Sequence, residues 1–427
     1  MRICFVGHQA SKEGAGRFML DQIDYLLQHD VTVFAIVPEW GPLCDELVQR
    51  RVEIAVVPNA LWNIPGGLKA RDYEEAVVAS RGMAGLFRQW AIDVVYTETS
   101  VVIAGALGAA LAALPHVWHL HEFSYNPRAI EMALPRDTLA RLMDLTSNFV
   151  FFNSKAVARE WDGLLPESKT RVVYNWTSFP ADEGSAPGDG HVRSLFKETT
   201  FVATIVGSIV PFKRQMDAIR AVGCLVREGV DIGLLVVGPP LHEPYYKSLV
   251  KLVDENGWRG IVRFVGYSEN ARQVMRESDV TLVCSDSESF GRVTIESMAQ
   301  GTPVIGADFG GTSEIIADGV DGLLFPPGDV ACLTQRLRSL IEEPNLRLHL
   351  SRGATETAKR FCDAEAVMAP VVELLQGLRG KSNPSWPLAS FIESGLSTFG
   401  APDAIVSRTS MRHMARGLVK RVIRRIW

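Results

Sequence analysis

The segment Ser285–Glu296 contains residue types that could bind a sugar and a phosphate. It leaves an apolar run, crosses a short polar loop and enters a helical pattern, with Glu288 and Glu296 on either side of Gly291. A glycine at such a junction lets the backbone approach a ligand closely, and the unpaired N–H groups that open a helix attract phosphate or sugar hydroxyls. Ionised carboxylates only accept hydrogen bonds, which suits the vicinal hydroxyls of a sugar and a ribose. The alternative is that Glu296 only complements the helix start and that Glu288 is a solvated loop residue.

A cation follows an apolar run earlier in the second half of the chain. The segment Gly207–Arg214 begins with a glycine and carries Lys213. A positive charge at this place can neutralise a diphosphate, and stabilising such a leaving group is a large part of the catalysis of group transfer. Taken singly, Lys213 is better explained as a solvated surface lysine. Its position after a glycine turn at the end of a strand favours the binding role.

The first half has two further candidate sites. The segment Glu13–Arg17 opens a helix after the first apolar run, but the glycine pattern of dinucleotide-binding proteins is broken by Met19. His121 and Glu122 follow the apolar run His116–Leu120, and ligands bind at the carboxyl ends of such strands. The alternative for His121 is a structural histidine at the end of a strand. We predict that His119 points to the opposite face of that strand.

Short apolar runs alternate with longer helical patterns through most of the chain, which is typical of parallel α/β sheets covered on both faces. In the first half, we predict strands at Arg2–Val6, Thr32–Val37, Glu53–Pro58, Val94–Glu98, His116–Leu120, Asn148–Asn153 and Arg171–Asn175. In the second half, we predict strands at Phe201–Gly207, Gly233–Gly238, Val262–Gly266, Val280–Ser285, Pro303–Ala307 and Gly322–Phe325.

These runs predict two doubly wound, Rossmann-like domains that face a cleft. We assign residues 1–180 to an N-terminal domain and residues 199–380 to a C-terminal domain. Residues 181–198 form the linker, because a stretch rich in Pro, Gly, Asp and Ser falls there. Residues 381–427 form a C-terminal extension.

Composition excludes several other classes of protein. The chain has 427 residues, of which 47% are hydrophobic and 22% charged, as in soluble proteins with sizeable cores. A net charge of −5 does not favour nucleic-acid binding. The six cysteines are scattered without close pairs, so we interpret them as reduced residues of a cytoplasmic protein. The run Val101–Leu114 is too short to span a bilayer and is predicted to be a buried helix.

The run from Glu288 to Asp329 closely resembles the E-x7-E signature of retaining glycosyltransferases of family four, which have the GT-B fold. Those enzymes share the pattern ESFG, then EAMAxGxPVI, then GGxxE, and finally a Pro-Gly-Asp. The corresponding segments here are Glu288–Gly291, Glu296–Ile305, Gly310–Glu314 and Pro327–Asp329. Because these segments stay in register over a run of more than forty residues, this resemblance is far more specific than a lone glycine motif. It covers about residues 1–380 and is strongest in the second half.

The resemblance implies roles for single residues. Glu288 would bind the donor sugar, and Glu296 the ribose. Backbone amides of Ser289, Phe290 and Gly291 would approach the sugar, and those of Arg292 and Val293 the diphosphate. Glu314 would support the loop structurally.

Other family positions match less completely. Lys213 matches the phosphate-binding lysine, but Ser208 stands where the family has an arginine, so one positive charge is missing unless Arg214 or Arg292 replaces it. The turn of Gly266 and Tyr267 resembles the loop that reads the nucleobase.

In the first half, Gly16 lies in a loop that resembles the family's phosphate-facing loop. His121 resembles the histidine that contacts the donor sugar or orients the acceptor. Asn175 is interpreted as structural.

The C-terminal extension is basic. From residue 381 to 427 there are eight Lys or Arg against Glu393 and Asp403, which gives +6. From Met411 to Trp427 apolar residues recur at helical spacing and basic residues fill the other face. Such a pattern predicts either a helix lying on an anionic membrane or a terminal helix that docks on its own fold.

The sequence therefore predicts a retaining glycosyltransferase that moves a sugar from a nucleotide-diphosphate donor to a saccharide or lipid-linked acceptor. We expect no cofactor and no metal, because no Asp-x-Asp triplet occurs in the chain. The expected location is the cytoplasm, with peripheral contact at the inner face of the plasma membrane if the extension is an anchor. The rival functions are a nucleotide-sugar epimerase or hydrolase on the same fold, and a non-catalytic protein that binds sugar nucleotides.

Overall fold

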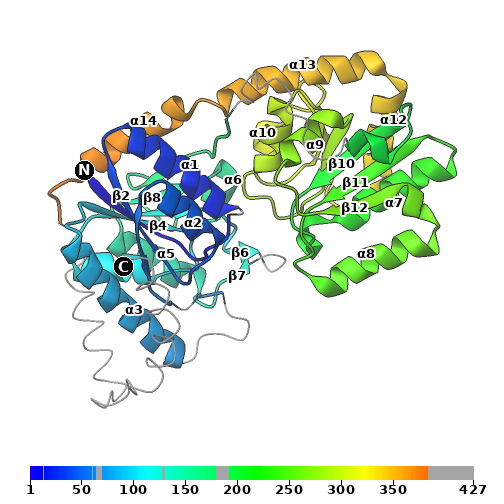
Figure 1. Cartoon of the computed structure of the whole chain (residues 1–427). Helices are drawn as coiled ribbons and strands as arrows, with labels where there is room; N and C mark the ends of the chain where they lie inside the picture. The colour runs from blue at the N-terminus through cyan, green and yellow to red at the C-terminus, as the bar shows by residue number, and fades with distance from the viewer. Residues whose placement is uncertain (13, 60, 64–69, 127–129, 179–191, 383–427) are drawn as a thin grey trace. The chain divides into compact units, whose positions relative to one another are not determined.

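A computed structural model describes residues 1–382, apart from residues 13, 60, 64–69, 127–129 and 179–191. The predicted linker lies largely outside these residues, and the basic C-terminal extension almost entirely so. The described part contains two parallel sheets, each flanked by helices (Figure 1). Among its helices, none combines the length and the apolar character that crossing a bilayer requires.

The first domain is built on a seven-stranded sheet in the order β3-β2-β1-β4-β5-β8-β9, in which all neighbouring strands are parallel. Its strands are β1 (Arg2–Val6), β2 (Thr32–Val37), β3 (Glu53–Val56), β4 (Val94–Glu98), β5 (His116–Leu120), β8 (Phe149–Phe152) and β9 (Thr170–Val172). A separate antiparallel pair consists of β6 (Tyr125–Asn126) and β7 (Ile130–Glu131). The helices that flank the seven-stranded sheet include α1 (Ala15–Gln28), α2 (Pro42–Gln49), α3 (Ala70–Gln89), α4 (Ala104–Leu111), α5 (Arg136–Thr146) and α6 (Lys155–Arg159).

The second domain has a six-stranded parallel sheet in the order β12-β11-β10-β13-β14-β15. Its strands are β10 (Phe201–Val206), β11 (Ile232–Val237), β12 (Val262–Gly266), β13 (Val280–Val283), β14 (Val304–Ala307) and β15 (Leu323–Phe325). Its α-helices are α7 (Gln215–Arg227), α8 (Glu243–Glu255), α9 (Ala271–Glu277), α10 (Arg292–Ala299), α11 (Thr312–Ile315), α12 (Val330–Glu342) and α13 (Pro344–Arg360). Short 3₁₀ turns are η1 (Val192–Leu195), η2 (Pro211–Lys213) and η3 (Trp258–Gly260).

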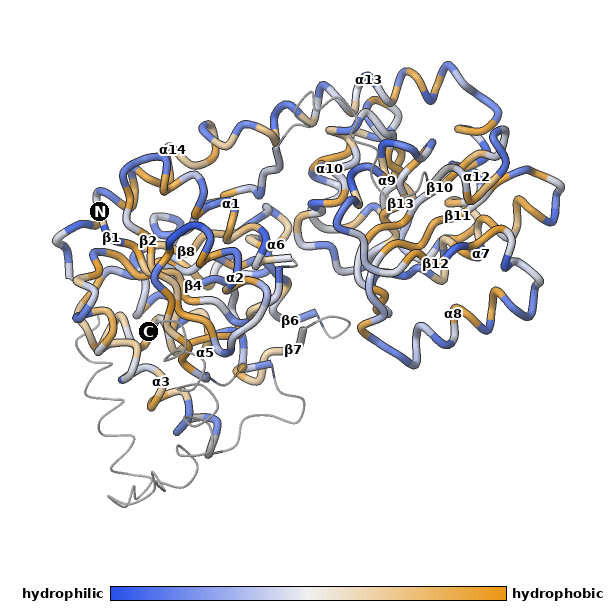
Figure 2. The backbone as a smooth tube through the Cα atoms, in the orientation of Figure 1, coloured by the Kyte–Doolittle hydropathy of each residue, from blue (hydrophilic) through white to orange (hydrophobic). Residues whose placement is uncertain are grey.

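The predicted strands are confirmed to within one to three residues at their ends. One reason is visible in Figure 2, where strands such as β11 are hydrophobic along their length. Strand β11, for example, is buried at all six positions. A strand covered on both faces must be apolar throughout, and this makes it easy to recognise in a sequence. The predicted buried helix is also confirmed, because α4 is buried from Ala104 to Ala110.

One helix joins a different core from the one that the sequence analysis assigned to it. Residues 364–376 were placed in the C-terminal domain, but α14 (Ala364–Gln376) packs beside α1 of the first domain (Figure 1). Its residues Met368, Val371 and Leu375 belong to the core that also contains β1 and β2. An amphipathic pattern predicts a buried face, but it does not say which sheet covers that face.

The cysteines are free, as predicted. Cys4, Cys44 and Cys284 are buried, and burial raises the pKa of the thiol in each of the three. They act as small apolar residues of the cores.

Candidate active site

The loop between β13 and α10 carries Glu288, and three glycines shape it. Gly291 has a φ of 99°, a conformation that L side chains rarely adopt, and the helix begins directly after it. Gly310 and Gly311 form a turn against this loop, and the N–H of Gly311 donates to the carbonyl of Glu288 at 2.9 Å. A Cβ on Gly310 would lie 2.1 Å from that same carbonyl oxygen. The glycine pair is therefore required for this close packing, which holds the loop in place.

Lys213 and Glu288 meet, although 75 residues separate them in sequence. The Nζ atom of Lys213 donates to Oε2 of Glu288 at 2.6 Å. Lys213 ends η2 after β10, and Glu288 follows β13, which is the neighbour of β10 in the sheet. The two loops are tied together because the carbonyl of Phe212 accepts hydrogen bonds from Asp286 N and Ser285 Oγ. The side chains remain 25% and 14% exposed, so water and ligands can reach them.

Arg214 forms ion pairs with two carboxylates. Its guanidinium donates to Asp217 at 2.6 Å and to Asp286 at 3.0 Å. Burial lowers the pKa of Arg214 and the two carboxylates raise it by more, so its pKa lies above the usual value. Ser208 stands nearby, and its carbonyl accepts a hydrogen bond from Gln215 at 3.0 Å. If Arg214 is to supply the charge that is missing at Ser208, it has to do so while it is paired with both aspartates.

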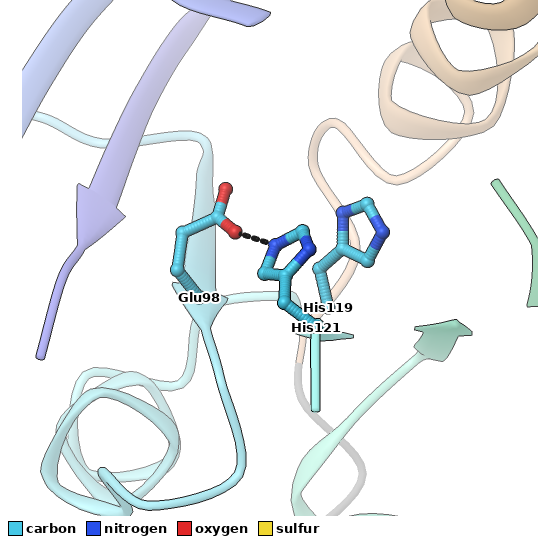
Figure 3. Close-up of side chains that lie close together, drawn as sticks. All are labelled: Glu98, His119 and His121. Atoms are coloured by element: carbon cyan, nitrogen blue, oxygen red, sulfur yellow. Dashed lines mark hydrogen bonds and ion pairs between the residues drawn. The ribbon is translucent and has the colours of Figure 1, made fainter. Parts of the chain in front are cut away.

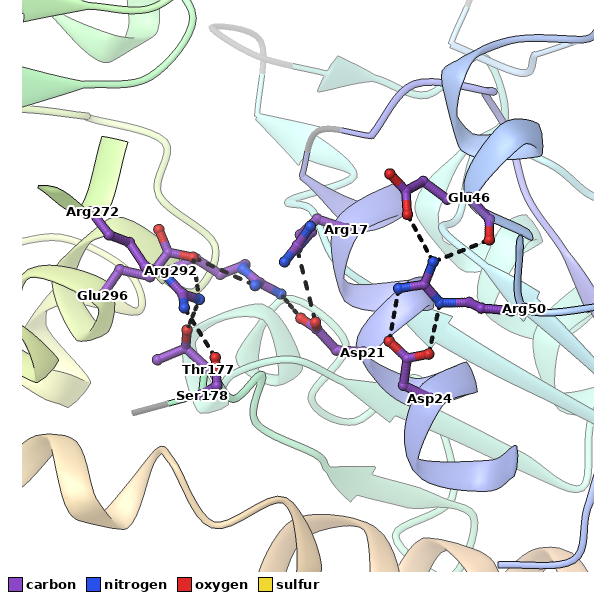
Figure 4. A network of polar contacts seen from close by, with 10 residues as sticks. All are labelled: Arg17, Asp21, Asp24, Glu46, Arg50, Thr177, Ser178, Arg272, Arg292 and Glu296. Carbon is purple, nitrogen blue, oxygen red and sulfur yellow. Dashed lines mark hydrogen bonds and ion pairs between the residues drawn. The ribbon is translucent and has the colours of Figure 1, made fainter. Parts of the chain in front are cut away.

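Arg292 and Glu296 belong to a network that joins α10 to α1 (Figure 4). The guanidinium of Arg292 donates to Asp21 at 2.8 Å and lies 3.4 Å from a carboxylate oxygen of Glu296. Arg272 approaches the same oxygen of Glu296 at 3.9 Å. Burial lowers the pKa of Arg292, but Asp21 and Glu296 raise it by more. Asp21 was not among the predicted site residues, because nothing local in the sequence distinguishes it from other acidic residues on the polar face of a helix.

Three other predicted donor-binding residues mainly make contacts within the protein. The hydroxyl of Ser289 donates to the backbone carbonyl of His121 at 2.5 Å. Phe290 is buried and its ring packs against those of Tyr174 and Phe361. Val293 packs against the same apolar cluster. Their side chains thus support the loop, and any contact with a donor falls to their backbone groups.

His121 belongs to a buried polar pair (Figure 3). Its Nε2 atom is hydrogen-bonded to the Glu98 carboxylate, which comes from the end of the adjacent strand β4. The two side chains are only 5% and 2% exposed. Burial raises the pKa of the Glu98 carboxyl above its ordinary value, and the nearby His121 opposes that rise. The acidic residue that ends the otherwise apolar strand Val94–Glu98 was the sequence signal for this partner, and it was overlooked.

The prediction for His119 is wrong. The rings of His119 and His121 lie side by side with their centres 4.1 Å apart, as Figure 3 shows. Residues two positions apart along an extended chain point to the same face, which is the physical reason for this arrangement. The Tyr96 hydroxyl lies 2.8 Å from Nδ1 of His119, and burial, together with His121, lowers the pKa of His119.

Glu98, His119 and His121 are also the described residues that could gather around a metal ion, because one ligand atom of each lies within 4.8 Å of the others. The atoms of Glu98 and His121 that face each other are already joined by a hydrogen bond. Nδ1 of His119 is engaged by Tyr96. The second side-chain atom of each residue, namely Glu98 Oε1, His119 Nε2 and His121 Nδ1, has no hydrogen-bond partner among the described residues.

The remaining predicted positions differ in exposure. Gly16 is buried in the first turn of α1, and a Cβ there would lie 2.2 Å from the carbonyl oxygen of Ser11. That contact within its own loop is sufficient to require glycine. Gly266 has a φ of 77° and its carbonyl accepts from the N–H of Gly238 at 2.7 Å. Tyr267 follows it and is 56% exposed.

Glu314 and Glu122 hold backbone segments in place. The carboxylate of Glu314 accepts hydrogen bonds from the N–H of Lys155 at 3.0 Å, the N–H of Ala156 at 2.5 Å and the hydroxyl of Tyr174 at 3.0 Å. It therefore binds the start of α6, in the first domain, in keeping with the structural role that was expected for it. Glu122 accepts from the N–H of Ser100 at 2.6 Å and so fixes the chain that follows Glu98.

Two family models match the chain. Residues 12–178 match Glycosyltransferase Family 4, and residues 190–357 match Glycosyl transferases group 1. The lipopolysaccharide core biosynthesis glycosyltransferase LpsE of Rhizobium meliloti is 31% identical over 268 residues, which cover 59% of this chain and 74% of that protein. The D-inositol 3-phosphate glycosyltransferase of Saccharomonospora viridis is 38% identical over 172 residues, or 38% of this chain and 39% of that protein. The match thus spans about two fifths of the length of that relative.

Among solved structures, HepE from Anabaena in complex with UDP-glucose is similar in fold, with a TM-score of 0.75 at 22% identity. The similarity covers 88% of this chain and all of that one. Together with the two parallel sheets, it defines a GT-B fold. The family matches and the relationship to LpsE go further: the chain belongs to glycosyltransferase family 4.

Proposed function

We propose that the protein is a retaining glycosyltransferase that moves a sugar from a nucleotide-diphosphate donor to a hydroxyl of a saccharide or lipid-linked acceptor. The observation that carries the proposal is the Lys213–Glu288 pair, which joins the loops after two adjacent parallel strands. Ligands of doubly wound sheets bind at this end of the strands. The names of the relatives support the same class of reaction, because both LpsE and the D-inositol 3-phosphate enzyme are glycosyltransferases.

The pair can exchange its partners when a donor arrives. Without a ligand, Lys213 and Glu288 neutralise each other at 2.6 Å. A diphosphate offers Lys213 a more highly charged partner, and this frees the Glu288 carboxylate to accept hydrogen bonds from sugar hydroxyls. The cation then stabilises the negative charge that develops on the departing nucleotide diphosphate.

Retention of configuration needs no nucleophile from the protein. The bond between the anomeric carbon and the diphosphate oxygen breaks, and a bond from the same carbon to the acceptor oxygen forms on the same face of the sugar. The proton of the acceptor hydroxyl passes to an oxygen of the departing phosphate. The residues of the chain bind, orient and exclude water: Lys213 holds the phosphate, Glu288 the sugar and Glu296 the ribose.

His121 contributes from the first domain. Because Nε2 is engaged with Glu98, the imidazole is held in one orientation and its Nδ1 atom remains for a ligand. The buried Nδ1 atom of His121 has no hydrogen-bond partner among the described residues. A buried polar atom without a partner is costly, and a hydroxyl of the donor sugar or the acceptor would satisfy it.

The activity is proposed to be independent of metal ions. Lys213 supplies the positive charge at the diphosphate, and the chain contains no Asp-x-Asp triplet to hold a cation there. Turnover should therefore be unchanged in excess EDTA. Loss of turnover in EDTA that added Mg²⁺ restores would contradict this part of the proposal.

We propose further that the protein acts in the cytoplasm, with peripheral contact at the inner face of the plasma membrane. The support is the sequence of the C-terminal extension, whose basic and apolar residues alternate at helical spacing from Met411 to Trp427. Each basic residue near an anionic leaflet contributes on the order of 1 kcal/mol. Deletion of residues 412–427 should move the protein from the membrane to the soluble fraction, and unchanged fractionation would exclude the anchor.

The reaction itself is tested by NMR of the products. Nucleotide-diphosphate sugars are first screened by thermal shift, since a ligand at 100 times its Kd adds about 2.7 kcal/mol of stability. The donor that stabilises is then incubated with and without a panel of saccharide and lipid-linked acceptors. Transfer with the anomeric configuration of the donor supports the proposal. Conversion of the donor without an acceptor would indicate an epimerase or hydrolase, and binding without any conversion a non-catalytic protein.

A further inference from the structure

A pocket is lined by Tyr174 and Phe361, which pack against Phe290 in the loop that carries Glu288. Its volume is about 340 Å³, and it is bounded by α6, the residues after β9, α11, and the residues around the α13–α14 junction. The lining includes three basic side chains, one acidic residue and two aromatic rings, namely Lys155, Arg159, Arg360, Glu314, Tyr174 and Phe361. None of the three basic residues was singled out by the sequence analysis.

Among the described residues, the basic side chains in this pocket have no acidic partner. Within the part of the chain that the structure describes, no carboxylate lies within 4.0 Å of the charged groups of Lys155, Arg159 or Arg360. Several other partly exposed cations of the protein are paired with carboxylates; Lys169, for example, binds Asp144 at 2.7 Å. Three exposed cations that gather around one pocket without a carboxylate favour a negatively charged ligand.

Glu314, the acidic residue of the pocket, does not neutralise the three basic side chains. The oxygens of Glu314 already accept hydrogen bonds from two backbone N–H groups and the hydroxyl of Tyr174. Three cations and one carboxylate leave a net charge of +2. This charge matches a phosphate monoester or a diphosphate better than a monovalent anion.

The positive charges of Arg159 and Arg360 act on Tyr174, which lines the pocket. Burial raises the pKa of Tyr174, and Glu314 adds to that rise, whereas Arg360 and Arg159 both lower it. Both guanidinium groups therefore act on the same phenol. The rings of Tyr174 and Phe361 also pack against Phe290. Two residues that line the pocket therefore contact the loop that carries Glu288.

We propose that this pocket binds a phosphate-bearing anion at a site separate from that of the sugar donor. Arg159 and Arg360 present planar guanidinium groups, which pair with two oxygens of a phosphate, and Lys155 adds a third charge. The shared chemistry is a phosphate or diphosphate group, and its source is either a free metabolite or the headgroup of a lipid. The residues that would bind the phosphate come from both domains, because Arg159 belongs to α6 and Arg360 ends α13.

The test is calorimetric titration of the full-length protein with inorganic pyrophosphate. It uses the Lys213→Ala variant as its background, so that pyrophosphate does not bind at the proposed donor site. This variant is expected to retain one pyrophosphate site. Adding Arg159→Gln and Arg360→Gln should weaken that binding by at least about tenfold, since two charge-assisted contacts are lost.

A matched control removes the same charge elsewhere. Arg259→Gln with Arg338→Gln in the same background also deletes two guanidinium groups, but these are paired with Asp254 and Glu228. The control should keep the affinity for pyrophosphate. Equal affinities of the two double replacements would overturn the proposal, as would the absence of binding both to pyrophosphate and to vesicles. Thermal unfolding of each variant checks folding, and Lys155→Gln provides a milder replacement.

Vesicles separate the two sources of the phosphate. Binding of the full chain to phosphatidylglycerol vesicles is compared with binding to phosphatidylcholine vesicles, for the pocket variant and the control. Weaker phosphatidylglycerol binding by the pocket variant alone assigns the site to a lipid headgroup. Unchanged vesicle binding with reduced affinity for pyrophosphate assigns it to a soluble phosphate compound.

Discussion

The second domain keeps its central ion pair close to water, whereas the first domain buries its own polar pair. Lys213 and Glu288 retain 25% and 14% of their side-chain exposure, but His121 and Glu98 retain only 5% and 2%. An accessible pair can exchange its partners for those of a ligand. A buried pair costs too much to separate and is better suited to hold one orientation. The two domains therefore contribute different things to the proposed reaction: exchangeable charge and fixed geometry.

The largest effect is expected from Lys213. Lys213→Ala should lower kcat by roughly 10²- to 10³-fold, because a preorganised group that stabilises the leaving group is lost. Steady-state kinetics with the preferred donor measures it. Lys169→Ala is the matched control, since Lys169 is also a partly exposed lysine bound to a carboxylate, that of Asp144. Comparable losses in both variants would mean that Lys213 has no special role.

Glu288 comes next. Glu288→Gln should reduce turnover at saturating donor by roughly 10²-fold, or about 2.7 kcal/mol of transition-state stabilisation. Glutamine keeps the size of the side chain but lacks the charge that orients the sugar. Asp144→Asn serves as the corresponding control. Unaltered turnover at saturating donor would remove Glu288 from the site.

A smaller effect is expected from the buried pair. Glu98→Gln should lower kcat by about tenfold with little change in KM, since the amide can still accept from His121 but no longer carries charge. The pH dependence of kcat should also change, which a purely structural role would not cause. Glu53→Gln is the control, because Glu53 accepts a hydrogen bond from Trp90 at the beginning of a strand. Identical pH profiles of wild type and Glu98→Gln would contradict the role of Glu98.

The last prediction concerns stability in acid. Burial lowers the pKa of His116 in the first domain to about 3, so the folded state does not take up the proton that the unfolded state binds below about 6.5. The contribution of neutral His116 to the free energy of unfolding is present in full above pH 6.5. It falls as the pH decreases towards 3, by at most about 1.4 kcal/mol per pH unit.

Urea unfolding at several pH values measures this slope. His116→Asn should flatten the loss of stability between pH 6.5 and pH 5, whatever its effect on stability at neutral pH. The exposed His349 provides the control variant, His349→Asn, whose slope should equal that of the wild type. Parallel curves for all three proteins would show that His116 titrates normally.

The sequence predicted the sheets well, and the exposed pair better than the buried one. The strands of both sheets are continuous apolar runs, so the sequence alone indicated their positions. Lys213 and Glu288 could be placed together because each follows a strand of the same parallel sheet. Glu98 ends the strand next to that of His121 and could have been found by the same reasoning, whereas the partner of Asp21 depends on which helices become neighbours. For the same reason, α14 was assigned to the wrong core.

The central claim is that Lys213 and Glu288 receive the diphosphate and the sugar of the donor. Calorimetric titration of the wild type and of Lys213→Ala with the nucleotide-diphosphate sugar selected by thermal shift tests it most directly. We predict that the wild type binds one donor molecule and that Lys213→Ala binds it at least about tenfold more weakly, which corresponds to about 1.4 kcal/mol. Equal affinity of the two proteins for the donor would contradict the account.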